Sequence, residues 1–126
     1  MYSVEVSESP VITVSGQRHE VRYAVDGSLM NPLEGFYACL AGCAAVYAKK
    51  ACKEIGQSPA GIHIQCRPIA GSGGAVSLGR FRTEVQFPEH FSPEDRARVL
   101  EAIGHCAVKE IVTSGCGVGF SVAEAA

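Results

Sequence analysis

The sequence predicts an α+β fold, in which short antiparallel strands and two main helices occupy separate stretches of the chain. Alternating apolar and polar residues, typical of strands, fill residues 1–30 and much of 61–87. Two other segments, 31–56 and 92–115, repeat apolar residues at helical spacing. The resulting order, βββα-ββα-β, is typical of segregated α+β architecture. Because 126 residues suit one hydrophobic core, we expect a single domain over residues 1–126.

Three short strands are expected before the first helix. Residues 3–6, 11–14 and 19–25 alternate in the manner of half-buried strands. The pairs Ser-Pro, Ser-Gly and Asp-Gly follow them in turn, and each pair favours a turn. Such short connections favour antiparallel pairing. The N-terminal region should therefore form an antiparallel sheet.

A long helix is predicted between Asn31 and Gly56. Asn31 is a suitable N-cap, Pro32 fits the first turn, and Gly56 suits the position after the last turn. Glu34 near the start, and several lysines near the end, match the helix dipole. The residues at helical spacing are Phe36, Cys39, Leu40, Cys43 and Tyr47, and the lysines are Lys49, Lys50 and Lys53.

A hairpin, a second helix and a last strand complete the predicted fold. Residues 61–69 and 76–87 are expected to pair through the glycine-rich connection 70–74. Ser92, with Pro and Asp among the next three residues, indicates the start of a helix. A last strand is expected at residues 118–122, after the glycines that end this helix. The apolar face of the helix consists of Val99, Leu100, Ile103, Cys106, Ala107 and Ile111.

Composition and charge exclude several classes of function. The net charge of −2 and the lack of a basic cluster argue against nucleic acid as a partner. The longest apolar stretch, residues 36–48, is shorter than the roughly 20 residues that a membrane-spanning helix needs. The N-terminus has no basic region followed by an apolar core, as a secretory signal would have. We therefore expect a cytoplasmic protein that does not insert into membranes.

Neither a nucleotide loop nor a metal site is expected. The glycines at 71–74 lack the lysine of a phosphate-binding loop and lead into a strand, so a turn is the better interpretation. The four histidines, His19, His63, His90 and His105, do not combine with cysteines at the spacing of a zinc site. We expect no metal and no bound cofactor.

The six cysteines therefore carry the main functional signal. In a reducing cytosol, such a number indicates redox chemistry or packing more than structural disulfides. Cys39 and Cys43 lie one helical turn apart, a geometry that resists bridging, so a long-range partner is the better candidate, and Cys106 on the second helix supplies one. Cys39 is interpreted as packing or as an alternative thiol. The cysteines interpreted as packing or surface residues are Cys52, Cys66 and Cys116.

Three short motifs at long spacing carry a family resemblance. They are NPLE at residues 31–34, AGC at residues 41–43 and HCAVKEIV at residues 105–112. Together they resemble the OsmC/Ohr family of thiol peroxidases, which carries an Asn-Pro helix start, an Ala-Gly-Cys in mid-helix and a later Cys-Pro. The resemblance spans residues 16–122. The sequence departs from the family at Leu33, where the family has Glu, and at Ala107, where it has Pro.

The resemblance implies an intertwined homodimer that reduces organic hydroperoxides or hydrogen peroxide. It assigns Cys43 as the attacking thiol and Cys106 as the resolving thiol, with an external dithiol as reductant and no cofactor. Glu34 would reach the site only across the dimer interface, since it lies nine residues before Cys43 on the helix. A cation should stabilise the thiolate. The resemblance assigns this cation to an arginine of the N-terminal sheet, for which Arg18 and Arg22, expected on one strand face, are both candidates.

Two alternative functions remain open from the sequence. A protein of the same fold without peroxidase activity would bind a small apolar or thiol-reactive ligand at the dimer interface. A structural or interaction domain would use its cysteines only for packing. A peroxide-sensitive Cys43 with turnover distinguishes the enzyme from both alternatives.

Overall fold

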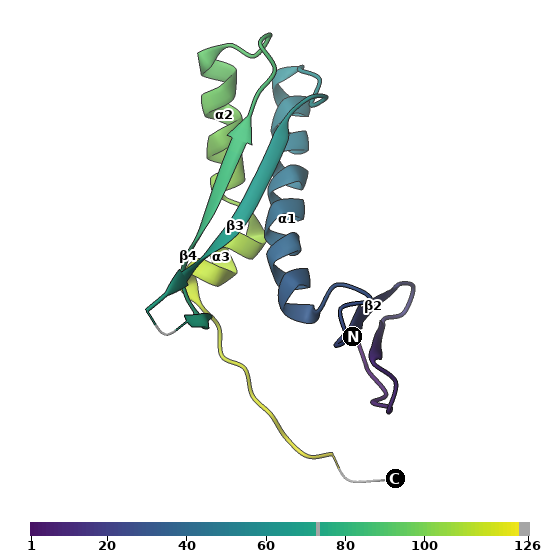
Figure 1. Cartoon of the computed structure of the whole chain (residues 1–126). Coiled ribbons are helices and arrows are strands. Elements are labelled where there is room, and N and C mark those ends of the chain that lie inside the picture. The colour runs from purple at the N-terminus through teal and green to yellow at the C-terminus, as the bar shows by residue number, and fades with distance from the viewer. Residues whose placement is uncertain (73, 124–126) are drawn as a thin grey trace. The chain divides into compact units, whose positions relative to one another are not determined.

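The computed structural model describes residues 1–72 and 74–123 and has an α+β fold (Figure 1). Within these residues the strands form two antiparallel two-stranded sheets, β1 with β2 and β3 with β4. The predicted fold class is therefore confirmed. The elements in chain order are β1 (Val11–Ser15), β2 (Glu20–Ala24), α1 (Pro32–Ile55), β3 (His63–Gly71), β4 (Gly74–Gln86), α2 (Pro93–Gly104) and α3 (Ala107–Ser114).

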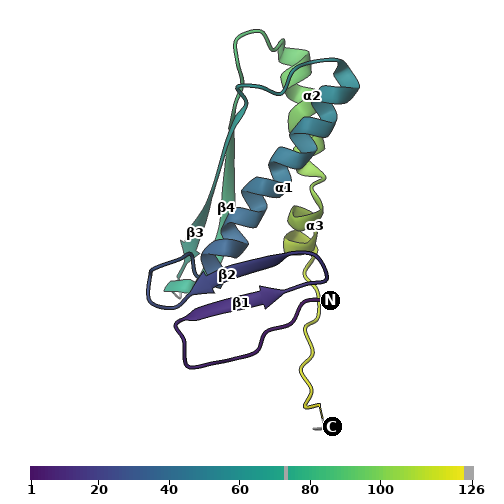
Figure 2. The same ribbon diagram turned by 90° about the vertical axis from the view of Figure 1, so that its right-hand side faces the viewer.

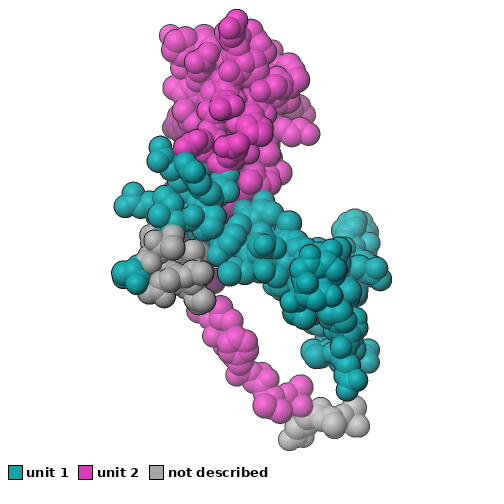
Figure 3. All heavy atoms as spheres, viewed as in Figure 1, with its two compact units in different colours: residues 1–39, 66–83 teal, residues 40–65, 84–126 magenta. Residues whose placement is uncertain are grey.

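The chain divides into two compact units (Figure 3). Unit 1 comprises residues 1–39 and 66–83, and unit 2 comprises residues 40–65 and 84–126. Each unit is built from stretches far apart in sequence, because α1, β3 and β4 each contribute to both units. The single domain over residues 1–126 stays a prediction.

The small sheet of unit 1 pairs β1 with β2 in antiparallel register, as Figure 2 shows. Val11 lies opposite Ala24 and Ser15 lies opposite Glu20. Ala24 is buried, and its backbone N–H donates to the carbonyl of Met30 at 3.1 Å. This hydrogen bond ties the end of β2 to the segment that leads into α1.

The predicted strand at residues 3–6 is wrong. Ser3 forms an isolated bridge with Ser15, in which each backbone N–H donates to the other residue's carbonyl at 2.9 Å. Val4 and Val6 are exposed. The apolar side chains of this segment are therefore not buried in unit 1, and a two-residue apolar period alone does not produce a strand.

The start of α1 is held by a reciprocal capping box in unit 1. The backbone N–H of Glu34 donates to Oδ1 of Asn31 at 2.9 Å, and the N–H of Asn31 donates to Oε2 of Glu34 at 3.0 Å. Asn31 is thus the cap that the sequence predicts. A turn later, Gly35 lies against the ring of Tyr23, where an added Cβ would be 2.6 Å from Cε1. This close approach accounts for a glycine inside the helix.

Unit 2 is organised around the second half of α1 and α2, which lie beside each other in both ribbon views (Figures 1 and 2). Small residues on α1 allow this close packing, and the aromatic ring of Phe91 fills the space before α2. The core cluster consists of Ala48, Ala51, Cys52, Phe91 and Val99, with Ile55, Ile62, Ile64, Phe87, Ala102 and Ile103 packed against it. The apolar residues that recur at helical spacing in α1 and α2 therefore contribute to the hydrophobic core of unit 2.

The start of α2 agrees with the sequence prediction. Ser92 is the N-cap, and its Oγ accepts a hydrogen bond from the backbone N–H of Asp95 at 3.1 Å. The Asp95 carboxylate in turn accepts from Nε2 of Gln57 at 3.1 Å. This contact links the loop after α1 to the first turn of α2.

The predicted second helix is in fact two helices. α2 ends at Gly104, and α3 begins at Ala107 after an extended residue, Cys106, with φ −54° and ψ 132°. The backbone N–H groups of His105 and Cys106 donate to carbonyls three residues earlier, at 3.0 Å each, which tightens and ends α2. Glycine at the end of α2 weakens helical continuation, and the break buries the Cys106 side chain.

The remaining strand predictions are partly correct. β3 and β4 match the expected hairpin, while Gly73 of its connection, residues 70–74, lies outside the described residues. The strand expected at residues 118–122 is wrong, since this segment has no strand assignment and its apolar side chains are exposed. Two-residue alternation is present there, but neither described sheet includes the segment.

We expect alanine substitutions of two glycines in α1 to have different effects on stability. Gly42→Ala should raise the free energy of unfolding by about 0.5–1 kcal/mol, because nothing lies within 4 Å of the added Cβ and alanine favours helix. Gly35→Ala should lack this gain, because its Cβ meets the Tyr23 ring. Urea unfolding of both variants measures the difference. An equal gain from Gly35→Ala would contradict the Tyr23 contact.

Candidate active site at Cys43 and Cys106

Two cysteines from distant parts of the sequence meet in unit 2. Cys43 lies on α1 and is half-buried, whereas Cys106 lies at the junction of α2 and α3 and is only 2% exposed. Their side chains form a hydrogen bond, and both cysteines are free thiols. The structure thus brings together the two cysteines that the sequence singles out as a pair.

The surroundings of Cys43 favour its thiolate. Burial raises the pKa of Cys43, but the Cys106 thiol, the backbone N–H groups of Val108 and Ala107, and the positive charge of Lys50 together lower it below the ordinary cysteine value. The two N–H groups belong to the first turn of α3, whose dipole also favours a negative charge.

The surroundings of Cys106 favour its protonated form. Burial raises the pKa of Cys106, and the hydrogen bond with Cys43 and the negative charge of the Cys43 thiolate raise it further. The backbone N–H groups of Lys109 and Val108 oppose this rise without cancelling it. The first proton to leave the pair is therefore lost from Cys43, and Cys106 remains a thiol that donates to the thiolate.

This arrangement has a definite chemical capacity. A thiolate is the nucleophilic form of cysteine, and Cys43 is the more exposed of the two sulfurs. Oxidation of a thiolate produces a sulfenic acid, which condenses with a neighbouring thiol to form a disulfide. Cys106 is already in hydrogen-bond contact with Cys43, so it is the neighbouring thiol for such a condensation.

Glu34, the first of the other expected site residues, has a structural contact in unit 1. Its carboxylate accepts the backbone N–H of Asn31 in the capping box of α1. A carboxylate near a helix N-terminus also interacts favourably with the dipole. These contacts explain an acidic residue at this position, and a catalytic part for Glu34 stays a prediction.

The two candidate arginines do not share a strand face. Arg18 lies in the exposed turn between β1 and β2, outside either strand, and Arg22 lies on β2 with Nε 3.9 Å from the Glu20 carboxylate. The expectation of a common strand face is therefore wrong, because the chain turns at residues 16–19 before β2 begins. Both side chains belong to unit 1, and their role toward Cys43 stays a prediction.

Sequence reasoning missed two features of the site. From the sequence, Lys50 is assigned only as a cation near the end of α1. Lys50 follows Cys43 by seven residues, about two helical turns, so the two side chains lie on the same helix face. The N-terminus of α3 was missed because no proline or strong capping residue marks the break at residues 105–106. The spacing could have identified Lys50, while the break depends on tertiary packing.

The remaining cysteines differ in exposure. Cys52 is fully buried in the core of unit 2, where burial and then the nearby Asp95 raise the pKa of its thiol, which supports a packing role. Cys66 is half-buried on β3. Cys39 and Cys116 are exposed.

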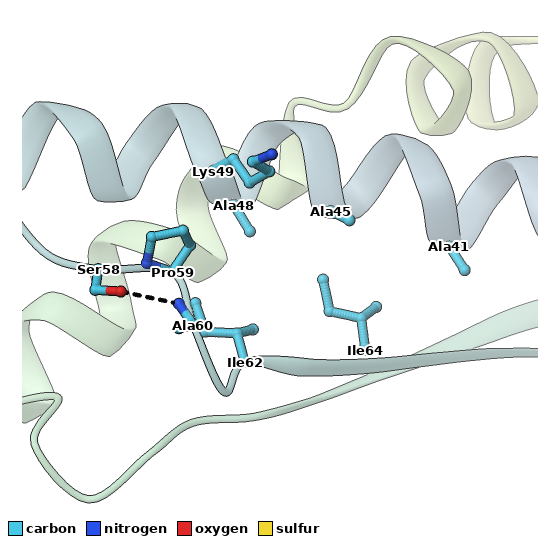
Figure 4. Close-up of a pocket in the computed structure, with 9 residues that line it drawn as sticks. All are labelled: Ala41, Ala45, Ala48, Lys49, Ser58, Pro59, Ala60, Ile62 and Ile64. Atoms are coloured by element: carbon cyan, nitrogen blue, oxygen red, sulfur yellow. Dashed lines mark hydrogen bonds between the residues drawn. The ribbon is translucent and has the colours of Figure 1, made fainter.

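An apolar groove of about 410 Å³ lies on another side of α1 in unit 2 (Figure 4). Alanines of α1 form one wall and isoleucines at the start of β3 form the other, while Ser58 accepts the N–H of Ala60 at 3.2 Å and shapes the connecting loop. Cys43 lies about 200° around the helix from Ala41, so the groove and the thiol occupy different faces. The groove is lined by Ala41, Ala45, Ala48, Lys49, Ser58, Pro59, Ala60, Ile62 and Ile64.

Two kinds of feature are absent from the described residues. No helix within 1–72 and 74–123 is long and apolar enough to cross a membrane. In the same part of the chain, no three or more His, Cys, Asp or Glu side chains gather in a way that could hold a metal ion.

We expect the pKa of Cys43 to lie below that of an ordinary cysteine and the pKa of Cys106 to lie above it. Because its pKa is lowered, Cys43 should react with iodoacetamide at a lower pH than Cys106, whose pKa is raised. Peptide-resolved mass spectrometry across a pH series gives each midpoint separately. Cys106→Ala should move the Cys43 midpoint upward by removing a donor, whereas Cys106→Ser keeps one. A midpoint for Cys106 below that of Cys43 would refute this assignment.

Two substitutions separate a capping role of Glu34 from a catalytic one. Glu34→Ala should lower the free energy of unfolding by about 1 kcal/mol, since it removes the acceptor for the Asn31 N–H. Glu34→Gln keeps an acceptor oxygen and should preserve most of this stability. Chemical denaturation measures both. If Glu34→Gln leaves stability intact but abolishes the reactivity of Cys43, the carboxylate has a role beyond capping.

Comparison with known proteins supports the fold. No protein-family model matches the sequence, and no curated protein matches it either. Among solved structures, an OsmC-like protein from Mycoplasma pneumoniae superposes with a TM-score of 0.73 at 10% identity, covering 90% of this chain and 86% of that chain.

A second structure, a proposed osmotic stress induced and detoxification response protein from Psychrobacter arcticus 273-4, has a TM-score of 0.71 at 11% identity. It covers 86% of this chain and 85% of that chain. These identities are too low to transfer activity, but the shared arrangement spans most of each chain. The chain therefore has the OsmC-like fold that the sequence motifs at residues 31–34, 41–43 and 105–112 predict.

Proposed function

We propose that this protein is a thiol-dependent peroxidase that reduces organic hydroperoxides or hydrogen peroxide. The observation that carries the proposal is the hydrogen-bonded pair of Cys43 and Cys106, in which one pKa is lowered and the other is raised. Such an asymmetry suits a reaction that needs one thiolate and one thiol at the same time. The OsmC-like fold supports the proposal, because a similar structure is described as a detoxification response protein.

In the first step, the Cys43 thiolate attacks one oxygen of the peroxide O–O bond. A sulfur–oxygen bond forms, the O–O bond breaks, and the other oxygen leaves as an alkoxide that takes a proton to become an alcohol. Cysteine is oxidised to a sulfenic acid, and the peroxide is reduced by two electrons. The N–H groups of Ala107 and Val108 lower the pKa of the attacking sulfur and so favour its ionised form.

In the second step, the Cys106 sulfur attacks the Cys43 sulfenic sulfur. A disulfide forms, and the sulfenic oxygen leaves as water after taking up the thiol proton. An external dithiol then reduces the disulfide by thiol–disulfide exchange and restores both cysteines. We also propose a cytoplasmic location, which the six free cysteines support because a reducing compartment keeps thiols reduced.

The proposed active unit is an intertwined homodimer. After α3, the described residues 115–123 have no helix or strand, and three of their alternating apolar residues, Val118, Phe120 and Val122, are 73%, 94% and 96% exposed. Exposed apolar segments of this kind are uncommon on a monomer and are typical of surfaces that another chain covers. A second copy of the chain is the partner that we propose.

The groove beside α1 favours a second candidate function. A protein of this fold without peroxidase activity would bind a small apolar ligand between the alanines of α1 and the isoleucines of β3. The wall residues Ala45, Ile62 and Ile64 are apolar and present no reactive group. In that case the thiol pair would be unnecessary for binding, and loss of Cys43 would leave ligand affinity unchanged.

The peroxidase proposal predicts a specific oxidation pattern. After a stoichiometric pulse of cumene hydroperoxide, the reduced protein should form a Cys43–Cys106 disulfide before any other cysteine reacts. In Cys106→Ser, a sulfenic acid should accumulate at Cys43, where dimedone traps it, because the resolving thiol is gone. Mass spectrometry with disulfide mapping measures both products.

Cys39→Ser is the matched control, since Cys39 lies on the same helix and is more exposed than Cys43. It should leave the Cys43–Cys106 disulfide and its rate unchanged. Slow and unselective oxidation of all cysteines in the wild-type protein would contradict the peroxidase. Retained ligand binding in Cys43→Ser would then favour the second candidate.

A further inference from the structure

We propose that Lys50 is the side chain that supplies positive charge to the Cys43 thiolate, and that Tyr47 positions it. The three residues follow one another along a single face of α1. Tyr47 is four residues after Cys43 and Lys50 is seven, which correspond to rotations of about 40° and −20° around the helix. The inference rests on the proposed function in one respect, which is that a peroxidase needs a thiolate at Cys43. Its test measures alkylation and uses no peroxide.

The direction of helical side chains brings the Lys50 ammonium toward Cys43. In an α-helix the Cα–Cβ bonds tilt toward the N-terminus, so a long side chain covers the turn that precedes it. Lys50 follows this rule, because its Nζ lies 4.9 Å from the centroid of the Tyr47 ring, one turn earlier. That turn lies between Lys50 and Cys43, so the ammonium lies N-terminal to the Lys50 Cα, in the direction of the Cys43 thiol.

The ring of Tyr47 gives the ammonium a fixed place. A cation within about 6 Å of an aromatic centroid is attracted by the negative face of the ring. Tyr47 is itself half-buried, so the ring is less free than a fully exposed side chain. A lysine without such a contact would sample many rotamers and spend little time near the sulfur.

Other charged groups near the site do not take this role. On α3, the Lys109 ammonium lies 3.6 Å from the Glu110 carboxylate, which offsets its charge, and the His105 ring at the α2–α3 junction lies 3.9 Å from the same carboxylate. On α1, Cys39 is an exposed thiol one turn before Cys43. The Cys106 thiol, at the α2–α3 junction, acts on Cys43 as a hydrogen-bond donor.

Lys49 offers a control within the same helix. It carries the same charge as Lys50 but lines the apolar groove, about 120° around the helix from Cys43. Lys49→Met and Lys50→Met therefore change net charge and helix composition equally. Only the second substitution removes a cation from the face that carries the thiol.

The test measures alkylation of Cys43 by iodoacetamide across a pH series, with each cysteine followed by peptide mass spectrometry. Lys50→Met should raise the Cys43 midpoint and slow its alkylation at neutral pH by about two- to fivefold, the effect of one partly exposed charge pair. Lys50→Arg should restore the wild-type midpoint, and Lys49→Met should leave it unchanged. Urea unfolding confirms that the variants remain folded.

Tyr47 is tested by a second pair of variants. Tyr47→Phe keeps an aromatic face and should preserve the Cys43 midpoint, whereas Tyr47→Leu should shift it upward in the same direction as Lys50→Met. Equal effects of Lys49→Met and Lys50→Met, or no effect of Lys50→Met, would overturn the proposal. If Cys43 titrates as expected but peroxide does not oxidise it, the peroxidase proposal fails while the role of Lys50 stands.

Discussion

The break between α2 and α3 is the constraint on which the candidate site depends. An uninterrupted helix would commit the N–H groups of residues 107–109 to carbonyls four residues earlier. Because α2 stops at Gly104, these donors belong to a new helix terminus and need other partners. No side-chain hydrogen bond caps α3, and two sulfur atoms stand at its start instead. The same break places Cys106 where it can donate to Cys43.

Around this terminus, burial and hydrogen bonding give two chemically identical side chains different properties. Cys43 receives donors from α3 and a positive charge from Lys50, while Cys106 is more deeply buried and faces the negative charge of its partner. A pair of titratable groups whose pKa values are driven apart is a recurring sign of divided roles in catalysis. The asymmetry arises from environment, because the residue type is the same.

The rest of unit 2 holds α1 in place, and α1 serves three surfaces at once. One face packs with Phe91 and Val99 in the core, a second borders the apolar groove, and a third carries Cys43. Alanines on the first two faces allow close packing without bulky side chains, so the helix stays rigid and near its neighbours. A reactive sulfur on such a helix has a fixed position relative to the core, which a loop would not provide.

The sequence by itself determined most of this protein's local structure. Periodicity predicts α1 and the strands β3 and β4, and residue type predicts the caps at Asn31 and Ser92, because these features depend on neighbouring residues. The motifs also pointed to the OsmC-like fold and to the two cysteines. Tertiary structure decided the helix break at Cys106 and the lack of strands at residues 3–6 and 118–122. These features depend on which surfaces lie nearby to bury a side chain or accept a hydrogen bond, and such surfaces come from residues distant in sequence.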